Sequence, residues 1–290
     1  MPALPFPIFV PIGSLRIPAH LILESLAYLA GFQLFRLNRK RSGDFLPDSG
    51  RMWIVAAAIC GAAIGSKLLY WLEDPMATWY RWSDPSYLLA GKTIVGGLLG
   101  GTLAVEWVKK RLAIQRRTGD LFAVPLAIGI AIGRIGCFTG GLADNTYGIA
   151  TNLPWGVDFG DGIRRHPTQL YEAVFLVLLA FALHWLSRRT HREGDVFRTF
   201  LIAYLGWRVA IDFLKPGVPV LGLTSLQWAS ITGIIAYRRD VLHLFARREG
   251  APWEAGSGPT SITTSQHPSA PPVFAAPMAK SSSKTETSIS

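Results

Sequence analysis

The sequence has little charge for its length. Only 17% of its 290 residues are Asp, Glu, Lys or Arg, whereas half are hydrophobic and ten are Trp. A soluble chain of this size usually carries more charge, so the composition favours a membrane protein. Cysteine is also scarce. Cys60 and Cys137 both lie in apolar stretches, which argues against a disulfide framework and against a zinc site built from paired cysteines, and we expect neither a metal ion nor a cofactor.

The amino-terminal stretch lacks the features of a signal peptide. No basic segment precedes the first apolar run, and MPALPFPIFVPIGSLRI has early prolines where a signal peptide has its apolar core. We therefore expect the first hydrophobic helix to be retained in the protein.

Long apolar runs are abundant. Since a membrane-crossing helix needs about 20 mostly apolar residues, we predict seven spanning helices, at about 17–36, 52–72, 93–108, 120–140, 167–187, 196–214 and 222–237. The predicted fold is an all-α polytopic membrane protein whose membrane domain covers residues 1–245. From about residue 250 the chain is rich in Pro, Ser, Thr, Ala and Lys and cannot bury enough apolar surface to fold, so we predict a disordered tail at 250–290.

Basic residues are spread unevenly over the connections. RLNRKR follows the first predicted helix, KKRLAIQRR the third, RRTHR the fifth and RR the seventh, and the other connections are poorer in Lys and Arg. By the positive-inside rule the amino terminus then lies outside and the tail is cytoplasmic. Because the basic residues lie in short clusters between apolar runs, the net charge of +10 points to a lipid bilayer as partner and not to a nucleic acid.

Several charged residues fall inside predicted helices, and those singled out by their depth in the outer half are Glu24, Lys67, Arg134 and Arg208. Such a residue costs at least about 2.5–3.5 kcal/mol on insertion scales, so it needs a function or a partner. Arg134 has no acidic residue within a helical turn, and Asp212, four residues after Arg208, can neutralise only one cation. One guanidinium group can donate two parallel hydrogen bonds to two phosphate oxygens. The surplus positive charge therefore predicts a phospholipid headgroup site.

Other interpretations of these residues are open on the sequence alone. An intramembrane arginine can pair with backbone carbonyls or extend to the interface, and Lys67 lies close enough to the membrane boundary to do the same. The run GGLLGG can be close packing of small residues between helices. His166, in the stretch RHP, is expected on the outer face at the mouth of the lipid site.

Longer motifs resemble one protein family. GRIGCF, LPWGV and RHPTQLYE occur in this order and are similar to GRxGNFxNxE, LPWGV and RHPSQLYE of the prolipoprotein diacylglyceryl transferases. PIFVPIGSLRI, GSKLLY, VGGLLGG and WRVAIDFLK extend the likeness over residues 5–240. The resemblance implies a bacterial inner-membrane enzyme. It would move the diacylglyceryl group of phosphatidylglycerol to the lipobox cysteine of a prolipoprotein and release glycerol phosphate.

The resemblance also implies roles for single residues. Arg134 and Arg208 match family arginines implicated in holding the lipid phosphate, and we predict that both are catalytic. The candidates for substrate binding lie in the matching motifs and are Lys67, Gly96, Gly97, Gly133, Tyr171 and Asp212. Asp212 and Lys215 are conservative replacements for a family Glu and Arg.

The sequence departs from the family motifs mainly at polar positions. The departures are Val95 for His, Cys137 for Asn, Gly140 for Asn and Leu142 for Glu. We predict that Asp144 or His166 takes over the lost proton-handling role. The alternative function is a non-catalytic phospholipid-binding membrane protein of the same fold. A small-solute transporter fits less well, because no paired interrupted helices mark a site at the membrane midplane.

Overall fold

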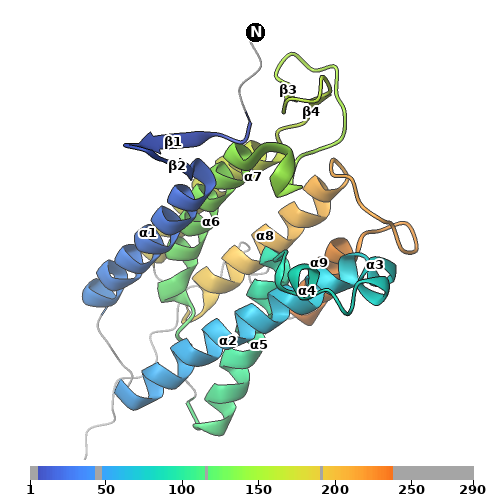
Figure 1. The fold of residues 1–290 in the computed structure, drawn as a ribbon. Coiled ribbons are helices and arrows are strands. Elements are labelled where there is room, and N and C mark those ends of the chain that lie inside the picture. The colour runs from blue at the N-terminus through green and yellow to red at the C-terminus, as the bar shows by residue number, and fades with distance from the viewer. Residues whose placement is uncertain (1–5, 43–47, 115–116, 190–191, 238–290) are drawn as a thin grey trace, which may run out of the picture. The chain divides into compact units, whose positions relative to one another are not determined.

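The computed structural model describes residues 6–42, 48–114, 117–189 and 192–237, and the predicted tail at 250–290 lies outside them. This part of the chain is mostly helical (Figure 1). Helices lie at all seven predicted positions, which confirms the helices but not that each spans a membrane: α1 (Ala19–Ser42), α2 (Asp48–Glu73), α5 (Ile94–Arg111), α6 (Asp120–Gly140), α7 (Thr168–Ser187), α8 (Asp195–Asp212) and α9 (Ser225–Ala236).

Short elements that the sequence analysis did not predict connect these helices. They are the hairpin of β1 (Phe9–Ile12) and β2 (Leu15–Pro18), the helices α3 (Pro75–Tyr80) and α4 (Pro85–Leu89), the 3-10 turn η1 (Gly141–Asp144), and the antiparallel pair β3 (Val157–Asp158) and β4 (Arg164–Arg165). Both short helices begin with a proline after a capping aspartate, Asp74 or Asp84, a common helix start. The fold is therefore mostly helical and not all-α.

Two pairs of helices pack along their lengths, α1 with α6 and α2 with α5. Glycines bring α2 and α5 together. A Cβ atom on Gly96 would lie 2.3 Å from the carbonyl oxygen of Gly65, and one on Gly100 would lie 2.4 Å from that of Gly61. Because any side chain there would push the helices apart, the run GGLLGG serves close packing at Gly96 and Gly100.

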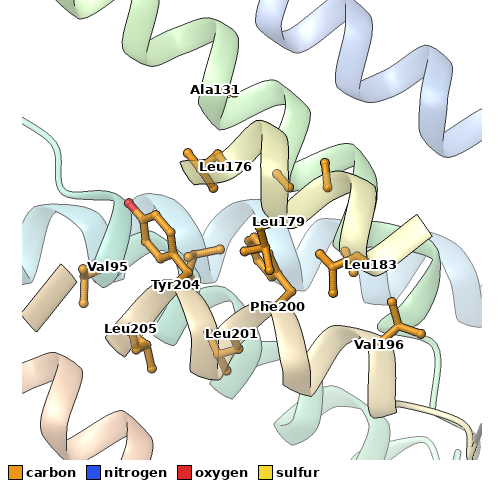
Figure 2. Packing of buried hydrophobic residues seen from close by; sticks show 14 of the residues in the cluster. Val95, Ala131, Leu176, Leu179, Leu183, Val196, Phe200, Leu201, Tyr204 and Leu205 are labelled. Atoms are coloured by element: carbon orange, nitrogen blue, oxygen red, sulfur yellow. The ribbon is translucent and has the colours of Figure 1, made fainter. Parts of the chain in front are cut away.

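The buried core surrounds α8 (Figure 2). Five α8 side chains have no exposed surface, and they lie in one core with leucines of α7: Val196, Phe200, Leu201, Tyr204 and Leu205. The start of α8 is tied to α6, because the carboxylate of Asp120 accepts hydrogen bonds from the backbone N–H groups of Gly194 and Phe197 at 2.7 and 2.9 Å. The position of α8 is thus fixed by packing and by a carboxylate at its first turn.

Large apolar side chains cover the outer faces of several helices, such as Leu37 on α1, Ile64 on α2 and Phe181 on α7, which are 49–70% exposed. Such surfaces suit contact with acyl chains better than contact with water. Three described segments are long and apolar enough to cross a membrane: Gly50–Glu73, Asp120–Asp144 and Thr168–Ser187. By the same measure α9 is too short with 12 residues, and α8 carries buried charged side chains that reduce its hydropathy.

Candidate functional site

A cavity of about 2200 Å³ lies between the helices, with walls from α1, α2, α5, α6 and α8. Pockets for drug-sized ligands have volumes of about 300–1,000 Å³, so this cavity has room for a larger ligand. Apolar residues such as Phe32, Ile54 and Ala62 line part of it. Charged residues line another part, which includes the C-terminal portions of α6 and α8.

One buried carboxylate organises the charged part of the cavity. Glu172, in the second turn of α7, has no exposed surface. Its Oε1 accepts a hydrogen bond from the Tyr204 hydroxyl at 2.7 Å and lies 3.0 Å from Nε of Arg134. Its Oε2 lies 3.4 Å from Nη1 of Arg208 and 3.9 Å from Nζ of Lys215. We refer to the Glu172 cluster as Glu172 with Arg134, Tyr204, Arg208, Asp212 and Lys215.

The cluster pairs both arginines with carboxylates. Nη2 of Arg208 lies 2.8 Å from Oδ1 of Asp212, as the four-residue spacing predicts, and the hydroxyl of Thr224 donates to the other oxygen of Asp212. The sequence analysis left Arg134 without a protein partner, which is wrong, because Glu172 from the next helix supplies one. Three cations face two carboxylates within the cluster, and the carboxyl group of Glu73, which also lines the cavity, interacts electrostatically with Arg208 and Lys215.

Both arginines line the cavity although they are almost fully buried, with side chains 8% and 4% exposed. Buried charges are stable only when paired, and this pairing holds the guanidinium groups of Arg134 and Arg208 in fixed positions. A fixed cation beside a cavity can stabilise negative charge on a ligand without rearranging first. The cluster is therefore chemically suited to an anionic group such as a phosphate.

Lys67 and Glu24 also line the cavity, and both have protein partners. The ammonium group of Lys67 donates to the carbonyl oxygens of Leu89, Ala90 and Gly91, so it holds the segment at and after the end of α4. This supports the alternative that Lys67 pairs with carbonyls. Glu24 forms an ion pair with Lys92 and accepts a hydrogen bond from the Tyr28 hydroxyl at 3.0 Å.

The two predicted proton-handling residues lie in different surroundings. Asp144, at the end of η1, lines the cavity, and its Oδ2 accepts a hydrogen bond from Thr146 at 2.5 Å. Nδ1 of His166 lies 3.3 Å from the hydroxyl of Tyr171, which also accepts a hydrogen bond from the indole of Trp155 at 2.7 Å. Neither His166 nor Tyr171 lines the cavity in the described part of the chain. Their roles stay predictions.

Of the three glycines predicted to bind substrate, two line the cavity and one does not. Gly97 and Gly133 line the cavity, whereas Gly96 does not and packs against α2. A Cβ atom on Gly133 would meet nothing within 4 Å, so this glycine borders open space. Of these three glycines, Gly97 and Gly133 lie where a ligand in the cavity could reach the backbone.

Sequence reasoning missed Glu172 and Tyr204 as site residues. The signal for Glu172 was present, since it ends the motif RHPTQLYE that opens an apolar helix. In the structure three motifs from distant parts of the sequence meet in the Glu172 cluster: GRIGCF supplies Arg134, RHPTQLYE supplies Glu172, and WRVAIDFLK supplies Arg208. The motifs that carry the resemblance are thus the motifs that build the site.

Comparison with known proteins finds the same family that these motifs resemble. The sequence family described as Prolipoprotein diacylglyceryl transferase matches residues 7–238. The chain belongs to this family. The expected family membership is therefore confirmed.

Curated relatives in the prolipoprotein diacylglyceryl transferase family match over most of their length. Three that carry the name Phosphatidylglycerol--prolipoprotein diacylglyceryl transferase illustrate this. The protein of Clostridium tetani is 33% identical over 238 residues, which cover 79% of this chain and 94% of the relative. The protein of Nitrosomonas europaea is 30% identical over 272 residues, with 86% and 93% covered. The protein of Bordetella parapertussis is 32% identical over 266 residues, with 83% and 95% covered.

Proposed function

We propose that this protein transfers the diacylglyceryl group of phosphatidylglycerol to the cysteine thiol of a prolipoprotein lipobox and releases glycerol phosphate. The relatives carry phosphatidylglycerol and prolipoprotein in their names. The observation that supports the proposal most is the position of Arg134 and Arg208, which are paired with Glu172 and line a cavity large enough for a lipid.

The Glu172 cluster fits the bond changes of this transfer. A carbon–sulfur bond forms at the glycerol carbon of the lipid, and the bond from that carbon to the phosphate oxygen breaks. Negative charge then develops on the departing phosphate oxygen, where Arg134 and Arg208 would stabilise it through charge-assisted hydrogen bonds. Glu172 and Asp212 hold the two guanidinium groups, so their part is to position the arginines.

The remaining predicted residues have smaller parts in the proposal. Gly97 and Gly133 border the lipid space, and Lys67 shapes its wall by holding the segment at the end of α4. The acceptor thiol must lose its proton to attack as a thiolate. Of the two candidate groups, Asp144 is favoured over His166 because it lines the cavity.

We further propose that the chain crosses the bacterial inner membrane at all seven helices, with α9 as part of the longer predicted span 222–237. The amino terminus then lies outside, and the cluster faces the outer leaflet. The basic residues at the ends of α1 and α5 support this orientation. α1 ends with Arg39, Lys40 and Arg41, and α5 with Lys109, Lys110 and Arg111. By the positive-inside rule these ends face the cytoplasm. The tail after residue 250 would then be cytoplasmic.

Complementation tests the proposed activity. A bacterial strain depleted of its own transferase would express this protein, and lipidation of a reporter prolipoprotein would be measured. We expect lipidation with the wild type and with Arg81→Lys, which changes an exposed arginine paired with Asp84 outside the cavity. Arg134→Ala should abolish it. A wild-type protein that inserts and binds phosphatidylglycerol but leaves the reporter unmodified would instead establish the non-catalytic alternative, which the replacement of the family histidine by Val95 favours.

A further inference from the structure

Three side chains of metal-binding type meet in the cavity wall outside the Glu172 cluster. They are His20 from the first turn of α1, Cys137 from α6 and Asp144 from η1, and their ligand atoms all lie within 4.8 Å of one another. Nδ1 of His20 lies 3.7 Å from Oδ1 of Asp144. All three residues line the cavity.

This spacing is close to that of a tetrahedral metal site. Zinc binds cysteine sulfur at about 2.3 Å and histidine nitrogen at about 2.0–2.1 Å, which puts neighbouring ligand atoms roughly 3.3–3.6 Å apart. The His20–Asp144 distance of 3.7 Å almost meets this condition. The three ligand atoms lie within 4.8 Å of one another, so they have to move closer by up to about 1.5 Å for one ion to bind all three.

The residues around His20 and Asp144 resemble those that surround metal ligands in proteins. A metal-bound histidine usually turns its other nitrogen to a carboxylate, and bound carboxylates are themselves hydrogen-bonded. Nε2 of His20 lies 3.5 Å from Oε2 of Glu24, while its Nδ1 is buried and has no hydrogen-bond partner among the described residues. Asp144 turns one oxygen to His20 and accepts a hydrogen bond from Thr146 with the other. The histidine is thus oriented with its unpartnered nitrogen toward Asp144.

Two glycines make room for this arrangement. A Cβ atom on Gly136 would lie 3.4 Å from the backbone oxygen of His20 and 3.7 Å from its Nδ1, and one on Gly140 would lie 3.1 Å from Cβ of Asp144. Larger residues would push His20 or Asp144 away from Cys137. Cys137 and Gly140 are also two of the positions where this sequence departs from the family motif.

We propose that His20, Cys137 and Asp144 bind one thiophilic divalent cation of the zinc class. A donor set of one sulfur, one nitrogen and one oxygen suits zinc and disfavours magnesium and calcium, which prefer oxygen ligands. With a thiolate and a carboxylate as ligands, a divalent ion makes the site neutral, which suits a position inside a membrane protein. With the ion bound Asp144 acts as a ligand, so the part of base given to it in the proposed function belongs to the metal-free protein.

The sequence alone predicts no metal ion, because Cys60 and Cys137 lie in separate apolar stretches. The proposed ligands are spread over the chain from position 20 to position 144, and only the packing of α1 against α6 brings them together. Three protein ligands leave one coordination position of a tetrahedral ion for a ligand that enters from the cavity. This binding proposal does not depend on the transfer reaction.

Cobalt binding to the purified full-length protein tests the site. After treatment with a chelator, the wild type should bind one Co²⁺ per chain, with a thiolate-to-cobalt charge-transfer band and the intense visible bands of tetrahedral Co²⁺, and Zn²⁺ should displace it. Cys137→Ser, which nearly preserves volume, should remove the charge-transfer band. Glu24→Gln should keep the band but weaken affinity about 10- to 100-fold, because Glu24 orients His20.

Cys60→Ala is the matched control, since Cys60 is the other cysteine and lies on α2 away from the cavity. It should leave the cobalt spectrum unchanged. Absence of a charge-transfer band in the wild type would overturn the proposal. So would a band that persists in folded Cys137→Ser or disappears in Cys60→Ala. None of these readouts measures transfer, so a negative result in complementation would not affect the metal site.

Discussion

Two walls of the cavity are held together in different ways. In the wall formed by α6 and α8, the carboxylate of Glu172 from α7 joins Arg134 and Arg208 in a buried cluster. In the wall formed by α2 and α5, backbone meets backbone at Gly65 and Gly96, and no charge takes part in that contact. Each wall contains a motif shared with the family and presents charged groups to the cavity, such as Arg134 in the first wall and Lys67 in the second. The walls differ in what joins their helices at these motifs.

The difference shows that a sequence motif does not reveal by itself whether it serves chemistry or packing. Gly96 and Gly97 are neighbours in one motif, but Gly96 is buried in the helix contact while Gly97 lines the cavity. Arg134 and Glu172 do both jobs at once, since their ion pair links α6 to α7 and fixes a cation beside the ligand space. Substitutions in the two walls should therefore destabilise the protein for different physical reasons.

The largest effect is expected for Glu172→Gln. This change keeps the shape of the side chain but leaves Arg134, Arg208 and Lys215 with Asp212 as the one carboxylate of the cluster. Removing one partner of a buried ion pair costs about 3–5 kcal/mol, so the variant should lose much of its stability. Thermal unfolding in detergent measures this, with Asp161→Asn, at an exposed carboxylate paired with Arg165, as the control. Equal melting temperatures for the two variants would show that Glu172 does not organise the wall.

A smaller loss is expected for Gly96→Ala in the other wall. The added methyl group would lie 2.3 Å from the carbonyl oxygen of Gly65, and overpacking of this kind costs about 1–3 kcal/mol. Gly206→Ala on α8 is the matched control, because a Cβ atom there meets nothing within 4 Å, and alanine favours a helix over glycine. The same unfolding assay compares them. If Gly96→Ala were as stable as Gly206→Ala, close packing would not explain the glycine run.

The smallest effect is expected outside both walls, for Asp161→Asn between β3 and β4. Arg165 donates to Asp161 at 2.6 Å, and this hydrogen bond holds the pKa of the Asp161 carboxyl below its usual range. The hydrogen bond contributes to the free energy of unfolding at a pH above the ordinary pKa of the carboxyl. This contribution is lost as the pH falls through the lowered pKa of the folded protein. Because exposed pairs contribute little, the melting temperature at neutral pH should not change measurably. A clear decrease would mean that this loop supports the fold.

The sequence predicts the helices well and the charge pairing poorly, for a physical reason. Apolar runs of helix length are a local property, so all seven long helices lie where they were expected. Pairing between Arg134 and Glu172 depends on how α6 packs against α7, which no local pattern shows. The Arg208–Asp212 pair was predictable because it lies within one helix. The cluster of His20, Cys137 and Asp144 likewise required the packing of α1 against α6.

Binding of phosphatidylglycerol to Arg134→Lys tests the central claim most directly, namely that the Glu172 cluster holds a lipid phosphate. Lysine keeps the charge and one ion pair to Glu172 but lacks the two-pronged geometry of a guanidinium group. Affinity should fall by about 1.5–3 kcal/mol, the size of one charge-assisted hydrogen bond, and further in Arg134→Ala. The measurement uses monodisperse protein in zwitterionic detergent, with Arg81→Lys as the control of unchanged affinity. Binding of phosphatidylglycerol to folded Arg134→Ala as tight as to the wild type would contradict the account.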